Sequence, residues 1–213
     1  EADGFNETIL PMDYKSGGQI SDDVIWGSIV WPLPSGVRLT ALMDCCHSGT
    51  GLDLPYEYDL RRQRWVEEIN PAHSKGDVIQ FSGCEDAQTS ADAGGDPFSK
   101  YQAGGAMTQS FIRAFRENPH ATYPAFMETI HRHLKRRGFP QRPALTSSQS
   151  FDVSARIFSF VEGIEPNRNM QIGRIKRKHI RPGRKMGSTV ESLFGGLGVA
   201  AGAMAIGSIF LGD

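Results

Sequence analysis

Hydrophobic residues along the chain follow two spacings, and these predict strands and helices. Apolar runs bounded by turn-forming residues occur at 37–43 and 78–81, which is typical of buried strands. Apolar residues three or four positions apart at 106–117 and 123–137 predict two helices that each bury one face. Strands that alternate with helices favour an α/β fold in which a sheet is flanked by helices.

Shorter patterns predict the remaining elements. A helix is expected from residue 22 to about residue 30, with Ser21 as its N-cap and two acids at the positive end of its dipole. The segment 61–75 is rich in Arg, Glu and Trp, and we expect it to be an exposed loop. Further short strands are predicted at 8–12, 144–146 and 157–160.

Composition and charge divide the chain into a body, residues 1–163, and a tail, residues 164–213. With 39% hydrophobic and 22% charged residues the chain is globular, and its net charge of -1 argues against nucleic acid as the main partner. Residues 166–213 contain eight Lys and Arg against two acids, a net charge of +6, which leaves -7 for the rest. The tail therefore differs in kind from the acidic body.

The tail contains a basic run followed by an uncharged stretch that begins at Leu193 and ends at Leu211. Its length permits a membrane span, and the spacing of Gly198 and Gly202 would let two helices pack closely. Its richness in Gly and Ala fits a soluble tail equally well, because these residues contribute little insertion energy. Membrane association through this stretch and a soluble tail both stay open.

The three cysteines do not form a disulfide framework, because Cys45 and Cys46 are adjacent. This usage fits a reducing compartment, so we expect a cytoplasmic protein. A zinc site is disfavoured, because adjacent cysteines are not a Cys-x-x-Cys pair and there is no second pair.

Chemistry is indicated directly after the predicted strand 37–43, where Asp44, Cys45 and Cys46 follow one another. Residues at the carboxyl ends of strands in open α/β sheets face the ligand crevice, and backbone amides there favour a thiolate. Only one of two adjacent cysteines can face the crevice, and spacing alone does not choose between them. Both are equally compatible with structural burial. The ring of His47 would point away from Cys46, so we do not assign it as the base.

The segment Asp44-Cys-Cys-His-Ser-Gly-Thr-Gly-Leu-Asp-Leu-Pro-Tyr56 resembles the nucleophile segment of type I metacaspases. The resemblance covers about residues 3–160 and also includes the segments 3–14, 20–23, 32–41, 82–92 and 104–108. It implies a caspase-like fold and a monomeric cysteine endopeptidase that cleaves protein or peptide substrates after Arg or Lys, with Cys46 as nucleophile. Residues 1–75 would belong to the large subunit and 76–163 to the small subunit.

The resemblance also implies a catalytic histidine in a Ser-Gly-His-Gly motif about 50 residues before the cysteine. Only 45 residues precede Cys46, and none of the six histidines lies in that motif. We therefore expect the base, and the early strands of the sheet, to come from a region before residue 1. The alternative is a catalytically inactive interaction or regulatory module, associated with a membrane through the tail.

The same resemblance assigns Asp44 to the pocket that binds the basic side chain of the substrate. Asp44 lies two residues before Cys46 and on an extended backbone would face the same side, where a carboxylate would pair with a cation. Asp86 and Asp92, in the loop after the next strand, are expected to help line this pocket. The alternative for Asp44 is a cap of the turn after the strand.

An activating calcium site is implied at Asp22, Asp23 and Asp53, with Asn6 at the family's fourth acidic position. Calcium prefers several oxygen ligands, and an amide in place of a carboxylate lowers the charge of the site. Capping of the predicted helix is the alternative role for Asp22 and Asp23.

Self-cleavage is expected at basic residues in exposed loops, which are common sites of proteolysis. The candidate residues are Arg61, Arg62, Arg64, Lys75 and Lys100.

Overall fold

The computed structural model describes residues 8–9, 11–44, 51–69, 71–83, 105–139 and 142–171. Several predicted features lie outside these ranges and have no structural description. They are Asn6, Cys45, Cys46, Asp86, Asp92, Lys100 and the stretch from Leu193 to Leu211.

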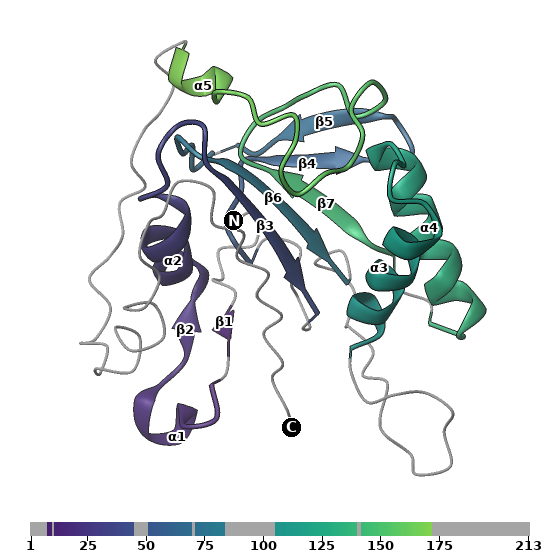
Figure 1. Cartoon of the computed structure of the whole chain (residues 1–213). Helices are drawn as coiled ribbons and strands as arrows, with labels where there is room; N and C mark the ends of the chain where they lie inside the picture. Colours follow the sequence, from purple (N-terminus) through teal and green to yellow (C-terminus); the bar gives the residue numbers. More distant parts are fainter. Residues whose placement is uncertain are drawn as a thin grey trace.

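A five-stranded sheet forms the centre of the molecule (Figure 1). Its strands, in spatial order, are β3 (Arg38–Met43), β6 (Asp77–Ser82), β7 (Ala144–Ser147), β4 (Tyr56–Asp59) and β5 (Arg64–Glu67). The pair β3–β6 is parallel and the other neighbours are antiparallel. The parallel pair matters most for function, because β3 and β6 end at the same edge of the sheet.

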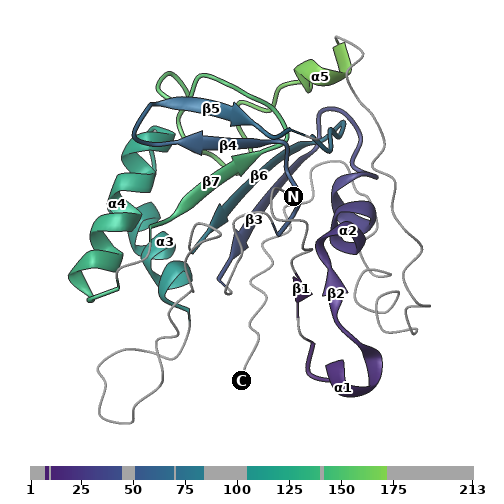
Figure 2. The same cartoon turned by 180° about the vertical axis from the view of Figure 1, so that it is seen from behind.

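Helices cover both faces of this sheet (Figures 1 and 2). On one face lie α3 (Ala106–Glu117) and α4 (Tyr123–Arg136), and on the other lie α2 (Asp22–Ile25) and the π-helix η1 (Trp26–Val30). Side chains alternate along β3 accordingly: Met43 packs with the α2 cluster and Leu42 with the α3–α4 cluster. The predicted α/β fold with a sheet flanked by helices is confirmed.

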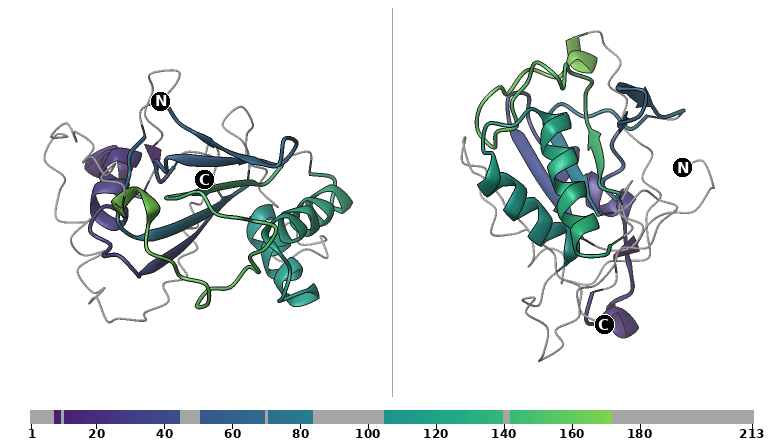
Figure 3. Two further views of the ribbon diagram at one scale, coloured as in Figure 1. Left: turned by 90° about the horizontal axis from the view of Figure 1, so that it is seen from above. Right: turned by 90° about the vertical axis from the view of Figure 1, so that its right-hand side faces the viewer.

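Four small elements complete the described fold (Figure 3). Strands β1 (Thr8–Ile9) and β2 (Ile20–Ser21) form a separate antiparallel pair, with α1 (Tyr14–Gly17) between them, and α5 (Arg168–Gln171) ends the described chain. Of the strand expected at 8–12, residues 8 and 9 are strand and residues 11 and 12 are not. Within the described ranges, no helix combines the length and the apolar character that crossing a bilayer requires.

Two sequence predictions are wrong. Part of the segment 61–75, expected as a loop, is strand β5, which pairs with β4 in a hairpin; Trp65 Nε1 donates to the carbonyl of Phe151 at 2.7 Å. The segment 157–160 is not a strand. It forms one isolated bridge, and Phe158 instead packs in the aromatic core, where its ring lies 4.7 Å from that of Phe126. In both cases tertiary packing decided the local structure.

Tyr123, at the start of α4, is fully buried, and its hydroxyl has no hydrogen-bond partner among the described residues. Burial raises the pKa of Tyr123 to about 12 from its ordinary 10.0, against the opposing effect of the Arg38 and Arg156 charges. Because the folded state holds this proton more tightly, its contribution to stability is complete below pH 10 and is lost as the pH rises through 12.

A Tyr123→Phe variant should therefore be at least as stable at pH 7, because it removes a buried unpaired hydroxyl. Between pH 10 and 12 it should lose less stability than the unmodified chain. Urea unfolding across this range measures both effects, with the exposed Tyr14→Phe as control. Equal alkaline losses in all three proteins would contradict the assignment.

Candidate active site

The carboxyl edge of the parallel pair β3–β6 brings together the segments that the sequence analysis singled out. Met43 and Ser82, the last residues of the two strands, lie opposite each other, and the Gly83 amide donates to the Met43 carbonyl at 3.1 Å. The chain therefore leaves the sheet at two neighbouring positions, after β3 at Asp44 and after β6 at Gly83. This is the edge at which open α/β sheets bind ligands.

Asp44 is the predicted site residue that the structure places at this edge. Its Oδ2 accepts a hydrogen bond from the Thr108 amide at 2.7 Å, and its Oδ1 accepts one from the Met107 amide at 3.4 Å. The carboxylate thus caps the amino end of α3, where the helix dipole stabilises negative charge. The alternative role predicted for Asp44 is to cap the turn after its own strand. Asp44 does act as a cap, but the capped element is a helix 63 residues further along the chain.

Gly105 makes this contact possible. A Cβ on Gly105 would lie 1.8 Å from Asp44 Oδ2, so no other residue fits without moving the carboxylate. Sequence reasoning missed this role, although a glycine directly before a predicted helix was visible. The carboxylate oxygens of Asp44 have more acceptor capacity than two amides use, so capping α3 is compatible with binding a basic side chain.

The acids expected to bind calcium are described in part. Asp22 is fully buried, and its Oδ1 accepts a hydrogen bond from the Asp23 amide at 2.6 Å. Asp53 is also buried and has a positive φ of 52°. The residues on either side of Asp53, Leu52 and Leu54, belong to the same apolar cluster as α2. Asp53 and Asp22 therefore flank one cluster.

A calcium centre is not formed by these residues alone. Nowhere in the described ranges do three His, Cys, Asp or Glu side chains gather closely enough to hold a metal ion. The hard oxygen atoms of Asp22, Asp23 and Asp53 suit calcium chemically, but the group they form is incomplete. Ser21 occupies the N-cap position of α2 and makes no side-chain capping bond.

Two of the described histidines contact glutamate side chains away from Asp44. His73 is buried, and its Nε2 lies 3.1 Å from Glu67 Oε1 on β5. His133 Nε2 lies 2.9 Å from Glu117 Oε2, between α4 and α3. A structural role, in contact with a glutamate, therefore accounts for both His73 and His133.

Similarity to known proteins points to one family. Residues 1–55 match the profile of the family described as metacaspase, peptidase C14 domain. The chain is 37% identical over 184 residues to Metacaspase-1 of Plasmodium falciparum, which covers 84% of the chain and 29% of that protein. It is 34% identical over 194 residues to Metacaspase-1 of Arabidopsis thaliana, covering 75% and 52%, and 41% identical over 138 residues to Metacaspase-2 of the same plant, covering 61% and 32%.

The chain spans about half or less of the length of these relatives. The matches nevertheless agree with the α/β fold of the described residues. The chain therefore belongs to the metacaspases, a family of caspase-like cysteine peptidases.

Proposed function

We propose that the protein is a cysteine endopeptidase that cleaves after Arg or Lys, with Cys46 as its nucleophile. The observation that carries the proposal is the position of Asp44, a carboxylate at the carboxyl edge of the parallel pair and two residues before Cys46. Family membership supports the reaction class. The basic side chain of the substrate would pair with Asp44, whereas an apolar side chain would bring no counter-charge to this carboxylate and an acidic one would be repelled by it.

The reaction proceeds in two steps. The base takes the proton of the Cys46 thiol, the thiolate attacks the carbonyl carbon of the scissile bond, the C–N bond breaks, and the protonated base returns the proton to the leaving amine. Water then hydrolyses the thioester, which releases the carboxylic acid end of the other fragment and regenerates the thiol. The base is a histidine in a segment before residue 1, which fits the greater length of the relatives.

Calcium activation is a second part of the proposal. The position of Asp22 and Asp53 beside one apolar cluster supports it, because carboxylate oxygens are the hard ligands that calcium prefers. Asp23 and the amide oxygen of Asn6 would complete the ligand set. Bound calcium would supply positive charge that holds these acidic segments together.

Self-cleavage is proposed at Lys75 or Lys100 in preference to the arginines of the β4–β5 hairpin. Asp59 Oδ1 accepts hydrogen bonds from the amides of Arg61 and Arg62 at 2.9 and 3.0 Å, so the turn of the hairpin is closed. A peptidase needs an extended segment, and opening this turn costs free energy. Lys75 is exposed and lies outside the strands.

The test uses the chain extended by the preceding part of its gene. We expect cleavage of an Arg peptide, none of the matched Asp peptide, and higher activity with calcium than with a chelator. Cys46→Ala should lower cleavage by about a thousandfold or more, as loss of a nucleophile does. The matched control Cys45→Ala should remain active. An extended protein that fails to cleave, or one in which Cys46→Ala keeps its activity, would reject the proposal in favour of an inactive interaction module.

A further inference from the structure

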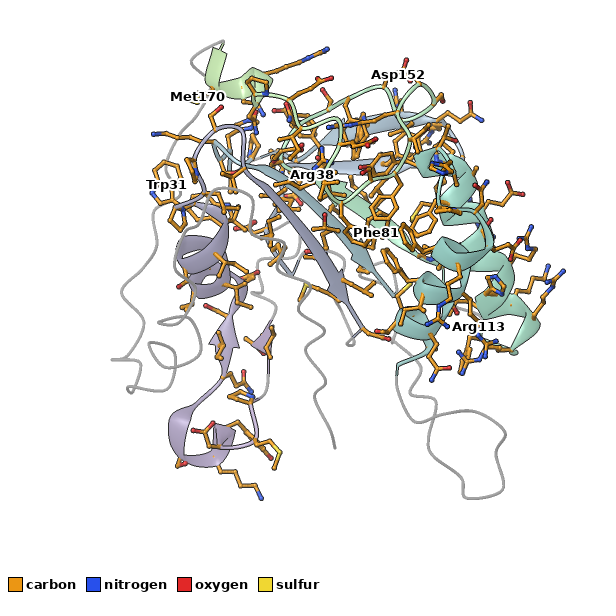
Figure 4. All side chains as sticks on the ribbon, in the orientation of Figure 1. Trp31, Arg38, Phe81, Arg113, Asp152 and Met170 are labelled. Atoms are coloured by element: carbon orange, nitrogen blue, oxygen red, sulfur yellow. The ribbon has the colours of Figure 1, made fainter. Side chains whose placement is uncertain are left out.

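The exposed side of α3 and α4 is strongly basic. Residues 105–142 contain seven Lys and Arg but only two acids, Glu117 and Glu128. Basic side chains gather along these helices in Figure 4, where Arg113 is labelled. We call the surface the basic helix face and define it by five exposed residues: Arg113, Arg116, Arg132, Lys135 and Arg136.

The acids of this region leave most of the basic charge unbalanced. Glu117 forms ion pairs with Arg132 and with His133, so its charge is already engaged. The other four members of the basic helix face form no ion pair with any residue that the structure describes. Unpaired cations on two packed helices form a surface that attracts anions.

Nearby cations also act on His131 of α4. The pKa of His131 lies below its ordinary value, first because of burial and then because of the charges of Arg142 and Lys135, while Glu128 acts in the opposite direction. Lys135, a member of the basic helix face, therefore contributes positive charge at this part of α4.

The basic helix face is connected to the active-site edge by α3 itself. The Thr108 amide bonds Asp44, and Arg113 and Arg116 follow on the same helix. At a rise of about 1.5 Å per residue, they lie about 7.5 and 12 Å along the axis from Thr108. An extended peptide advances about 3.3 Å per residue, so three or four residues cover this distance.

We propose that the basic helix face binds acidic residues of the substrate that lie about three to six positions from the cleaved Arg or Lys. This inference rests on the proposed function and adds a second determinant to the substrate class. A polypeptide fits better than a long polyanion, because residues 1–104 carry 17 acids against seven Lys and Arg and would repel one.

The test measures binding of fluorescent peptides to the full chain carrying Cys46→Ala, so that no probe can be cleaved. One peptide has a single Arg among neutral residues. Two others add four Glu three to six positions before or after the Arg. We expect one acidic peptide to bind about tenfold more tightly than the neutral one at low salt, and this advantage to disappear at about 0.5 M salt.

Charge-reversal variants test whether Arg113 and Arg116 cause the tighter binding of the acidic peptide. Arg113→Glu with Arg116→Glu should reduce binding of the acidic peptide to the level of the neutral peptide, and the pair Arg113→Gln and Arg116→Gln should reduce it partly. The matched control, Arg61→Glu with Arg64→Glu on the β4–β5 hairpin, should change nothing, because these exposed residues lie on another part of the fold. Equal binding of all peptides, or an equal loss in the control, would overturn the inference.

Other anions provide a further outcome. An oligonucleotide of equal charge, or vesicles containing anionic lipid, should bind more weakly than the acidic peptide. If either bound more tightly than the peptide, and Arg113→Glu with Arg116→Glu abolished that binding, the inference of an acidic peptide as ligand would be overturned. Asp44→Asn should weaken the binding of all Arg peptides equally.

Failure of this inference and failure of the proposed function give different results. If the acidic peptide binds more tightly than the neutral one but the extended protein never cleaves, only the proposed function is rejected. If the extended protein cleaves but the acidic peptide binds no more tightly, only this inference is rejected.

Discussion

Replacing Asp77 with alanine is expected to destabilise the folded chain by about 3–5 kcal/mol, the range for breaking a buried ion pair from one side. Asp77 is fully buried at the start of β6, where its Oδ2 accepts hydrogen bonds from Arg38 Nε at 3.1 Å and from Arg156 Nη2 at 3.4 Å. The guanidinium of Arg38 also donates to the carbonyls of Ser159, Glu162 and Gly163. Without Asp77, two largely buried cations lose their counter-charge.

Urea unfolding followed by tryptophan fluorescence measures this loss. Asp59→Ala is the matched control, because its ion pair with Arg62 is exposed and its removal should have a much smaller effect. The double variant Arg38→Met with Asp77→Leu should recover part of the stability, since the more deeply buried of the two cations is then removed and only Arg156 lacks its partner. Equal destabilisation by Asp77→Ala and Asp59→Ala would show that this network does not hold the segment 151–165 on the sheet.

Replacing Gly105 with alanine is expected to impair both stability and cleavage. The φ of Gly105 is -58°, a value that alanine adopts freely, so the backbone itself is not strained by the change. The new Cβ would lie 1.8 Å from Asp44 Oδ2 and must displace the carboxylate from the amino end of α3. Loss of such a cap costs about 1–2 kcal/mol. Cleavage after Arg should fall at least about tenfold if the proposed function holds, because Asp44 would be displaced from the position proposed to bind the substrate cation.

Two measurements on the extended protein separate these effects: thermal unfolding, and kcat/KM for an Arg peptide. Gly17→Ala is the control, because its Cβ would approach only the side chain of Asp13, at 3.0 Å, near the surface. Asp44→Asn should lower kcat/KM while keeping most of the stability, since an amide oxygen can still accept a bond from Thr108. If Gly105→Ala behaved like Gly17→Ala, the contact between β3 and α3 would have no functional role.

The elements that were predicted well are those whose own side chains carry the pattern. In α3, Met107, Phe111 and Phe115 recur at helical spacing, and the helix ends at Glu117 as expected. The hairpin strand β5 escaped detection, because Arg64 and Val66 are exposed while Trp65 and Glu67 are only half-buried. Its partner β4 ends at Asp59, close by in the sequence, but the mostly polar, partly exposed residues of β5 leave little local trace of a strand.

In the candidate site, too, features carried by neighbouring residues could be predicted, whereas contacts between distant residues could not. The importance of Asp44 could be inferred from its place before Cys46, but its hydrogen bonds to Met107 and Thr108 join residues more than 60 positions apart. No spacing rule describes a contact of that kind. The misassigned segment 157–160 alternates apolar residues as a strand does, yet the ring of Phe158 contacts that of Phe111 at 5.7 Å in the core. Packing overrode the local pattern there.

The order of strands has a consequence for a severed backbone. Strand β7 follows α3 and α4 in the chain, but it lies between β6 and β4, which both precede them. If the backbone were cut anywhere between Gly83 and Gly105, the later fragment would keep its strand hydrogen-bonded on both edges to the earlier one. The two fragments should elute together in size-exclusion chromatography under native conditions and separate only in denaturant. Cleavage in this region would therefore leave both fragments in one folded molecule.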